Sequence, residues 1–125
     1  MTIRVVLADD HRMLRDALVL VLGRETDIEV VGVADDGPSA IALARAHVPD
    51  VMVLDIAMPG INGVEVARRV HRNQPHVRIL ILSAYMDKRF VQETLKAGAA
   101  GYVTKAAAAA ELPRAIRAVA GARTI

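Results

Sequence analysis

Val51-Met52-Val53-Leu54-Asp55 is the stretch of sequence that decides the fold. Four apolar residues precede a single carboxylate, and Pro59-Gly60 soon ends the run. A continuous apolar run of this length is typical of a strand buried on both faces, as in a parallel sheet covered by helices. Open parallel sheets bind their ligands at the carboxyl ends of the strands. Asp55 is therefore a candidate functional residue.

The rest of the chain alternates between short apolar runs and segments with apolar residues at helical spacing. The expected strands are residues 3–8, 28–34, 51–55, 77–82 and 101–104. The expected helices are residues 12–23, 39–48, 62–70 and 87–98, and a last helix that ends near residue 120. Asn62 and Asp87 are the expected caps of the third and fourth helices. The fourth helix is expected to turn four side chains inward: Phe90, Val91, Thr94 and Leu95. Strict βα alternation predicts an α/β fold, a flavodoxin-like doubly wound five-stranded parallel sheet, (βα)5, with strand order 2-1-3-4-5.

Polar side chains follow four of the expected strands. They are Asp9-Asp10, Asp55, Ser83 and Lys105. The strand order brings these ends to one edge, where two carboxylates about 4 Å apart repel by roughly 4 kcal/mol at an effective dielectric of 20. Three carboxylates therefore need a cation or a raised pKa, and an all-oxygen site suits Mg²⁺. With an ammonium and a hydroxyl nearby, the set predicts a phosphoryl site with an aspartate nucleophile.

Composition limits the classes of protein that remain. The chain has 125 residues, no cysteine and a net charge of +2, which predicts one domain without disulfides and argues against nucleic-acid binding by this chain itself. Only three residues are aromatic, and no apolar run is long enough to span a membrane. The N-terminus does not look like a signal peptide, so we expect a cytoplasmic protein without membrane contact.

Four motifs occur in order along the chain: LADDH (residues 7–11), VLDIAMPGING (53–63), LSA (82–84) and KAGAAGYVTK (96–105). Together they resemble the receiver domain of bacterial two-component response regulators, over essentially the whole chain. The residues of these motifs also resemble the NarL/FixJ-type subfamily, whose members usually carry a C-terminal helix-turn-helix DNA-binding domain. The resemblance implies a receiver domain at residues 1–120 and the start of a linker, at 121–125, to a DNA-binding domain absent here.

The resemblance also implies a function and partners. The chain would be a phosphorylation-activated switch that controls transcription, and it would not be an enzyme beyond self-phosphorylation and self-dephosphorylation at Asp55. A sensor histidine kinase would donate the phosphoryl group, a homodimer is expected, and DNA would be bound only through the absent domain. Mg²⁺ would be the cofactor.

Individual roles follow from the same resemblance. Asp10, Asp55 and the main-chain carbonyl of Ala57 would bind Mg²⁺ directly, and Asp9 would bind it through water. Ser83 and Lys105 would hold the phosphoryl oxygens. Ser83 and Tyr102 would be the switch residues that alter the surface of the fourth helix, fifth strand and fifth helix.

Other interpretations of the same residues stay open. Asp9 or Asp10 alone would more often be a helix cap, and Lys105 alone a solvated charge. A Mg²⁺-dependent phosphohydrolase with an aspartate nucleophile is the alternative enzyme class, although such enzymes carry Asp-x-Asp after the first strand. A phosphate-independent receiver that acts as an interaction module is a third class. A nucleotide or flavin scaffold is disfavoured because the first loop is acidic and lacks glycine.

Two positions depart from the family pattern. Ala106 follows Lys105, where many receivers have a proline that is often cis, so the loop is either trans or strained. Pro113 falls inside the last expected helix, where it removes a backbone hydrogen bond. We therefore expect this helix to start late, near Ala109 or Ala110, and to be loosely held at its start.

Overall fold

The computed structural model describes residues 2–84 and 88–121. Five parallel strands form one sheet in the order β2-β1-β3-β4-β5, which confirms the predicted fold class. The strands are β1 (Ile3–Ala8), β2 (Ile28–Ala34), β3 (Val51–Asp55), β4 (Arg78–Ser83) and β5 (Gly101–Thr104). The helices are α1 (Arg12–Gly23), α2 (Gly37–His47), α3 (Gly63–Asn73), α4 (Lys88–Lys96) and α5 (Ala108–Gly121).

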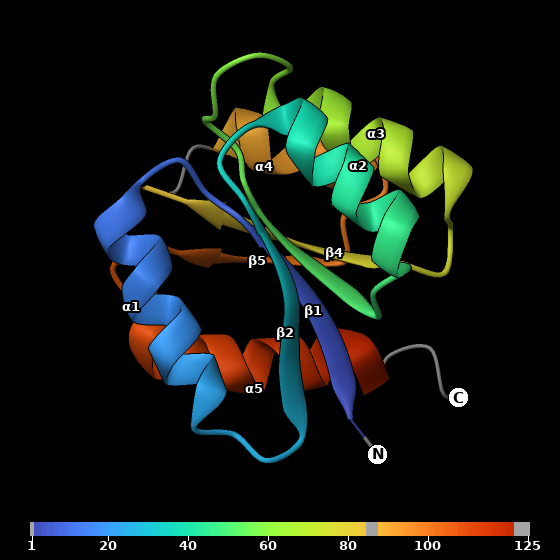
Figure 1. The fold of residues 1–125 in the computed structure, drawn as a ribbon. Helices are drawn as coiled ribbons and strands as arrows, with labels where there is room; N and C mark the ends of the chain where they lie inside the picture. Colours follow the sequence, from blue (N-terminus) through green and yellow to red (C-terminus); the bar gives the residue numbers. More distant parts are fainter. Residues whose placement is uncertain (1, 85–87, 122–125) are drawn as a thin grey trace.

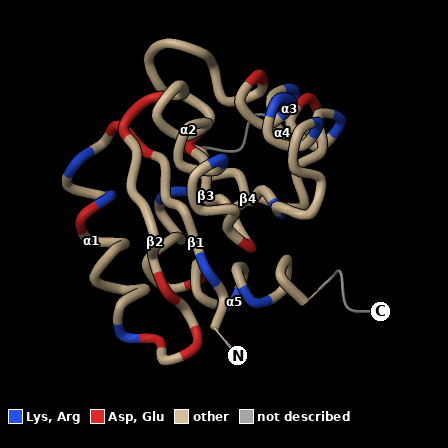
Figure 2. Tube along the Cα trace, turned by 45° about the vertical axis from the view of Figure 1, so that its right-hand side comes forward, with Lys and Arg blue, Asp and Glu red and all other residues tan. Residues whose placement is uncertain are grey.

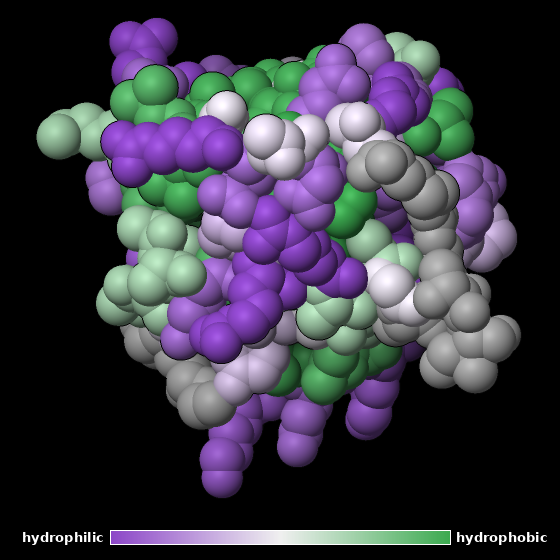
Figure 3. Space-filling model, turned by 90° about the horizontal axis from the view of Figure 1, so that it is seen from below, coloured by the Kyte–Doolittle hydropathy of each residue, from purple (hydrophilic) through white to green (hydrophobic). Residues whose placement is uncertain are grey.

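The sheet lies between two layers of helices. Helices α1 and α5 cover one face, and α2, α3 and α4 cover the other (Figure 1). Alternate strand residues divide between two cores: Val51 and Val53 pack on the α1–α5 side, and Met52 and Leu54 on the other. All five residues of β3 are buried, as the apolar run predicted. Seen from below, where α5 lies in Figure 1, the surface mixes polar and apolar side chains (Figure 3).

Helix α2 begins two residues earlier than predicted because of a cap that the sequence analysis missed. The Asp36 carboxylate accepts a hydrogen bond from the Ser39 N–H at 2.7 Å, and Pro38 lies in the first turn, where its missing N–H costs nothing. At the other end Val48 takes a left-handed conformation with φ of 45°. Arg4 Nη1 donates to the carbonyl oxygen of His47 at 2.6 Å and so satisfies a helix-end acceptor.

Helix α5 begins at Ala108, one to two residues before the predicted start. A turn precedes it, in which the Ala107 N–H donates to the Thr104 carbonyl at 3.1 Å. The peptide bonds of the described residues are trans, including Lys105–Ala106. Pro113 is inside the helix, and its ring leaves the Ala109 carbonyl without a helical donor. Ala109 is an exposed residue.

The predicted inward face of α4 is wrong at two positions. Phe90 is 48% exposed and Leu95 is 46% exposed, whereas Thr94 is the buried residue of the helix. The main contact of α4 is with α3. The predicted cap Asp87 lies outside the described residues. Helix α1 also exposes an apolar residue, Met13, at 81%.

None of the helices within the described ranges has the length and apolar character needed to cross a membrane.

Candidate functional site

The strand register brings the acidic residues together at one edge of the sheet. Ala8 on β1 pairs with Leu54 on β3, so Asp9 and Asp55 come next on two adjacent strands. Asp9 is 0% exposed and Asp55 is 1% exposed. One carboxylate oxygen from each of these residues and from Asp10, which is exposed, lies within 4.8 Å of the others. The predicted cluster is therefore present.

Lys105 reaches this cluster from the end of β5. Its Nζ lies 3.0 Å from Asp55 Oδ2 and 3.4 Å from Asp9 Oδ1. Its main-chain N–H donates to the Ser83 carbonyl at 2.7 Å, which fixes the residue against β4. One ammonium thus contacts two buried carboxylates.

Main-chain N–H groups hold one oxygen of each buried carboxylate. The His11 N–H donates to Asp9 Oδ1 at 2.8 Å, and the Ala57 N–H donates to Asp55 Oδ1 at 3.1 Å. Asp9 Oδ2 is buried without a hydrogen-bond partner among the described residues. Buried acceptors are nearly always satisfied, and an all-oxygen set of carboxylates is what a hard divalent cation prefers. The acidic pocket therefore fits a metal ion such as Mg²⁺.

Burial sets the protonation behaviour of Asp55. Loss of solvent raises its pKa to about 6, and the neighbouring Asp9 adds to the rise. The Ala57 N–H and Lys105 act in the opposite direction, because both stabilise the carboxylate. For Lys105 burial lowers the pKa, but the two aspartates outweigh burial and the net pKa is raised. Lys105 therefore stays protonated beside the carboxylates.

The two predicted switch residues lie at different depths. Ser83 is buried at the carboxyl end of β4, where it pairs in register with Thr104. Tyr102 is half-buried on β5 and borders a hollow formed with Lys88, Val91 and Gln92 of α4. Ser83 thus belongs to the strand ends that form the site, whereas Tyr102 belongs to the α4–β5 surface.

A glycine positions the loop that follows Asp55. A Cβ on Gly63 would lie 2.6 Å from the Cα of Ile56, so the first turn of α3 can approach the loop only with glycine there. The Gly63 N–H donates to the Ile56 carbonyl at 3.1 Å, and Asn62 caps α3 as predicted by accepting from the Glu65 N–H. The sequence analysis quoted Gly63 within a motif without seeing this role.

Arg15 is a second residue that the sequence analysis missed. Its Nη1 donates to the main-chain carbonyl of Asp9 at 3.2 Å. A helix side chain points back toward the N-terminus, so a residue four positions after His11, the N-cap of α1, can cover the loop before the helix. The spacing of four residues between His11 and Arg15 was the feature of the sequence that could have indicated this contact.

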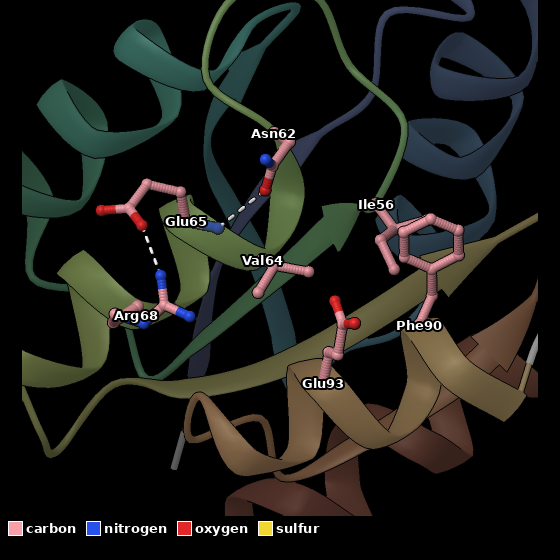
Figure 4. A pocket seen from close by; sticks show the side chains of 7 residues that line it. All are labelled: Ile56, Asn62, Val64, Glu65, Arg68, Phe90 and Glu93. Atoms are coloured by element: carbon pink, nitrogen blue, oxygen red, sulfur yellow. Dashed lines mark hydrogen bonds and ion pairs between the residues drawn. The ribbon is translucent and has the colours of Figure 1, made fainter.

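A cavity of about 300 Å³ lies between α3 and α4, outside the acidic cluster. Phe90 and Glu93 of α4 face Val64 across it, and Ile56 borders it from the loop after Asp55 (Figure 4). Basic and acidic residues are interspersed along α3 and α4 (Figure 2), where Glu65 pairs with Arg68 and Arg69. The cavity is thus separate from the site of the buried aspartates.

A five-stranded sheet in this order, with buried aspartates and a lysine at the strand ends, defines a receiver-type domain. The family model described as the response regulator receiver domain matches residues 5–117. The chain therefore belongs to the response regulator receiver domain family.

Its relatives include transcriptional regulatory proteins and response regulators. The transcriptional regulatory protein DegU of Brevibacillus brevis is 39% identical over 118 residues, which are 94% of this chain and 50% of DegU. The response regulator GacA of Pseudomonas aeruginosa is 40% identical over 124 residues, or 98% of this chain and 58% of GacA. The chain thus spans about half the length of the curated relatives it matches.

Solved structures agree with this assignment. The signal receiver domain of the response regulator NarL from Mycobacterium tuberculosis has a TM-score of 0.93 and 38% identity, with 98% of each chain covered. A LuxR-family two-component response regulator from Aurantimonas sp. SI85-9A1 has a TM-score of 0.92 and 36% identity, with 98% of this chain and 88% of that chain covered. The predicted resemblance to receivers of this subfamily is confirmed, and the homologues are signalling proteins.

Proposed function

We propose that this chain is a switch that accepts a phosphoryl group on Asp55 from a sensor histidine kinase. The observation that carries the proposal is the buried Asp55 carboxylate, with Lys105 Nζ 3.0 Å away and two further carboxylates beside it. Asp10 is exposed and the Lys105 side chain is 19% exposed, so a donor can approach from their side.

The proposed transfer is a displacement at phosphorus. An oxygen of the Asp55 carboxylate attacks the phosphorus of a phosphohistidine, a P–O bond forms, and the P–N bond breaks. The imidazole of the kinase leaves with the electron pair and takes a proton from solvent. Lys105 and Ser83 hold the phosphoryl oxygens, because an ammonium and a hydroxyl stabilise the negative charge there.

Mg²⁺ is the proposed cofactor, held by Asp10, Asp55 and the Ala57 carbonyl, with Asp9 acting through water. When bound it neutralises charge on the carboxylates and on the transferred group. Asp9 Oδ2 is buried and has no hydrogen-bond partner within the described part of the chain, which supports this assignment. Water later removes the phosphoryl group from Asp55, and the chain has no other reaction in this proposal.

Intact mass spectrometry after incubation with acetyl phosphate and Mg²⁺ tests the proposal. We expect one added phosphoryl group, and none in Asp55→Asn or without Mg²⁺. Asp50→Asn is a matched control, because Asp50 lies at the opposite end of β3. Addition to Asp55→Asn would contradict the assigned acceptor. Repeated turnover of phosphoesters would instead favour the phosphohydrolase class.

The proposed output is a change at the α4–β5–α5 surface, in which Ser83 and Tyr102 respond to the phosphoryl group. Phosphorylation adds up to about two negative charges and three strong acceptors, enough to bias a two-state element. Amide chemical shifts with beryllofluoride test this proposal. Large changes at Tyr102 are expected, and none would contradict its role.

We further propose that residues 1–120 form the receiver, and that 121–125 begin a linker to a helix-turn-helix domain that binds DNA in the cytoplasm. The regulator names and greater length of the relatives support this proposal. Direct DNA binding by the present chain, measured by fluorescence anisotropy, would contradict it.

A homodimer is also proposed. Exposed apolar side chains support two alternative faces, α1 with Leu20 at 70% and α4 with Phe90 at 48%. Light scattering of Leu20→Glu and Phe90→Glu, each with beryllofluoride, distinguishes the faces. The variant that stays monomeric identifies the interface, and a wild type that is monomeric throughout contradicts the proposal.

A further inference from the structure

We infer that Arg15 is a positioning residue for the divalent-cation site, because it fixes the peptide group that joins Asp9 to Asp10. The inference rests on the proposed function, since it concerns the same cation. Arg15 lies on α1 and donates from Nη1 to the Asp9 carbonyl at 3.2 Å. That carbonyl belongs to the peptide whose rotation would displace the Asp10 carboxylate.

Two other polar groups of Asp9, its N–H and Oδ1, are held from different directions. Its N–H donates to the Ala34 carbonyl on β2 at 3.0 Å, and its Oδ1 accepts from the His11 N–H at 2.8 Å. The bond from Arg15 completes this set, so the β1–α1 loop is tied to β2 on one side and to α1 on the other. Asp10 itself is exposed and depends on this loop for its position.

The charge of Arg15 does not explain why its side chain lies against the loop that carries Asp9 and Asp10. Within residues 2–84 and 88–121, no carboxylate forms an ion pair with it, and its Nε is buried without a hydrogen-bond partner. A guanidinium near a cation site opposes cation binding by simple repulsion. Charge and hydrogen bonding therefore predict opposite effects of removing the residue, which makes the inference testable.

Arg15→Met keeps the length of the apolar stem and removes both the donor and the charge. Replacing a residue that orients a metal ligand through a hydrogen bond typically lowers metal affinity 10- to 100-fold. Calorimetric titration with Mg²⁺ is expected to show affinity about tenfold weaker in Arg15→Met. Arg15→Lys restores a donor and should recover most of the loss. Arg12→Met, on the same helix at an exposed position, should bind as the wild type does.

A metal-free readout separates this inference from the proposed function. The His11 amide, bonded to Asp9 Oδ1, should exchange its hydrogen faster in Arg15→Met than in Arg12→Met. The unfolding midpoint should change little, because the variant also removes an unsatisfied buried donor. Affinity for Mg²⁺ that is unchanged or tighter in Arg15→Met would overturn the inference. If the wild type bound no Mg²⁺, the cofactor proposal would fail, and His11 exchange would still decide the role of Arg15.

Discussion

Lys105 Nζ lies 3.0 Å from Asp55 Oδ2, although 50 residues separate the two in sequence. The same ammonium is 3.4 Å from Asp9 Oδ1, so a single cation is shared between two buried carboxylates. Lys105 is also attached by its main chain to the Ser83 carbonyl. The charge balance of the site therefore depends on how β5 sits beside β4.

Replacing Lys105 by Met should raise the pKa of Asp55 further. An opposite charge at this distance lowers a carboxyl pKa by about one to three units, and the variant removes that effect. Carboxyl ¹³C chemical shifts of the metal-free protein measure the change. Lys96→Met, an exposed position on α4, should leave Asp55 unaffected. An unchanged Asp55 pKa in Lys105→Met would mean that the ammonium does not interact with Asp55 in solution.

The contribution of Asp55 to the stability of the metal-free protein should fall as pH rises through the titration of this group. The pKa of this group is raised from 3.8 to about 6 by burial, so between about pH 4 and about pH 6 the folded state binds more protons than the unfolded state. A shift of one pKa unit corresponds to about 1.4 kcal/mol in the free energy of unfolding. Above the pKa of Asp55 in the folded state, this group should therefore lower the free energy of unfolding by about 3 kcal/mol. Urea unfolding in EDTA across this range measures it.

Asp55→Asn is the control for this pH dependence. It removes the buried charge, so the contribution in this window should disappear and the variant should be more stable than the wild type above about pH 6. Mg²⁺ should stabilise the wild type more than Asp55→Asn. A stability difference between the wild type and Asp55→Asn that does not change with pH in this window would contradict the assignment.

Gly63→Ala should destabilise the protein by about 1–3 kcal/mol, the usual cost of overpacking. The added Cβ would lie 2.6 Å from a main-chain atom of Ile56, so the loop that carries Ala57 must move. Gly23→Ala is the matched control: nothing lies within 4 Å of a Cβ there, and a gain of about 0.5–1 kcal/mol is expected in a helix. Equal effects of the two changes in urea unfolding would show that the close contact with Ile56 is absent.

Val48→Asn should stabilise the protein by about 1 kcal/mol. Val48 has φ of 45°, where a β-branched residue is strained and asparagine is tolerated. Its side chain is 45% exposed, so little packing is lost. Val33→Asn in β2, at 41% exposure, is the contrasting change and should destabilise. Thermal unfolding compares the two, and a loss of stability in Val48→Asn would contradict the strain argument.

Much of the fold could be predicted because the strands are short, apolar and regularly spaced. Four of the five strands have the predicted bounds, and β4 is displaced by one residue, to Arg78–Ser83. Helix bounds were predicted less well, since α2 depends on a cap by Asp36 and α5 on how the turn after Lys105 is hydrogen-bonded. Such bonds join main-chain and side-chain atoms whose placement apolar periodicity does not encode.

The site could be predicted for a similar reason. Asp9, Asp55 and Lys105 each lie at the carboxyl end of a strand, and strand order alone brings them together. Arg15 could not be found this way, because it lies within a helix and reaches the site through a main-chain carbonyl. The outward position of Phe90 was missed because helical spacing identifies an apolar face without saying what covers it.

The edge position of β5 links local motion to charge. This strand has four residues and pairs with β4 alone, whereas Asp9 and Asp55 extend the central β1–β3 pair. Sheet edges fray more readily than sheet centres, because fewer contacts must break. Each opening of β5 withdraws the Lys105 ammonium while the two buried aspartates stay together. Fraying of this edge therefore favours proton uptake by Asp55. Hydrogen exchange at β5 should quicken, relative to the intrinsic exchange rate, as pH falls toward the pKa of Asp55.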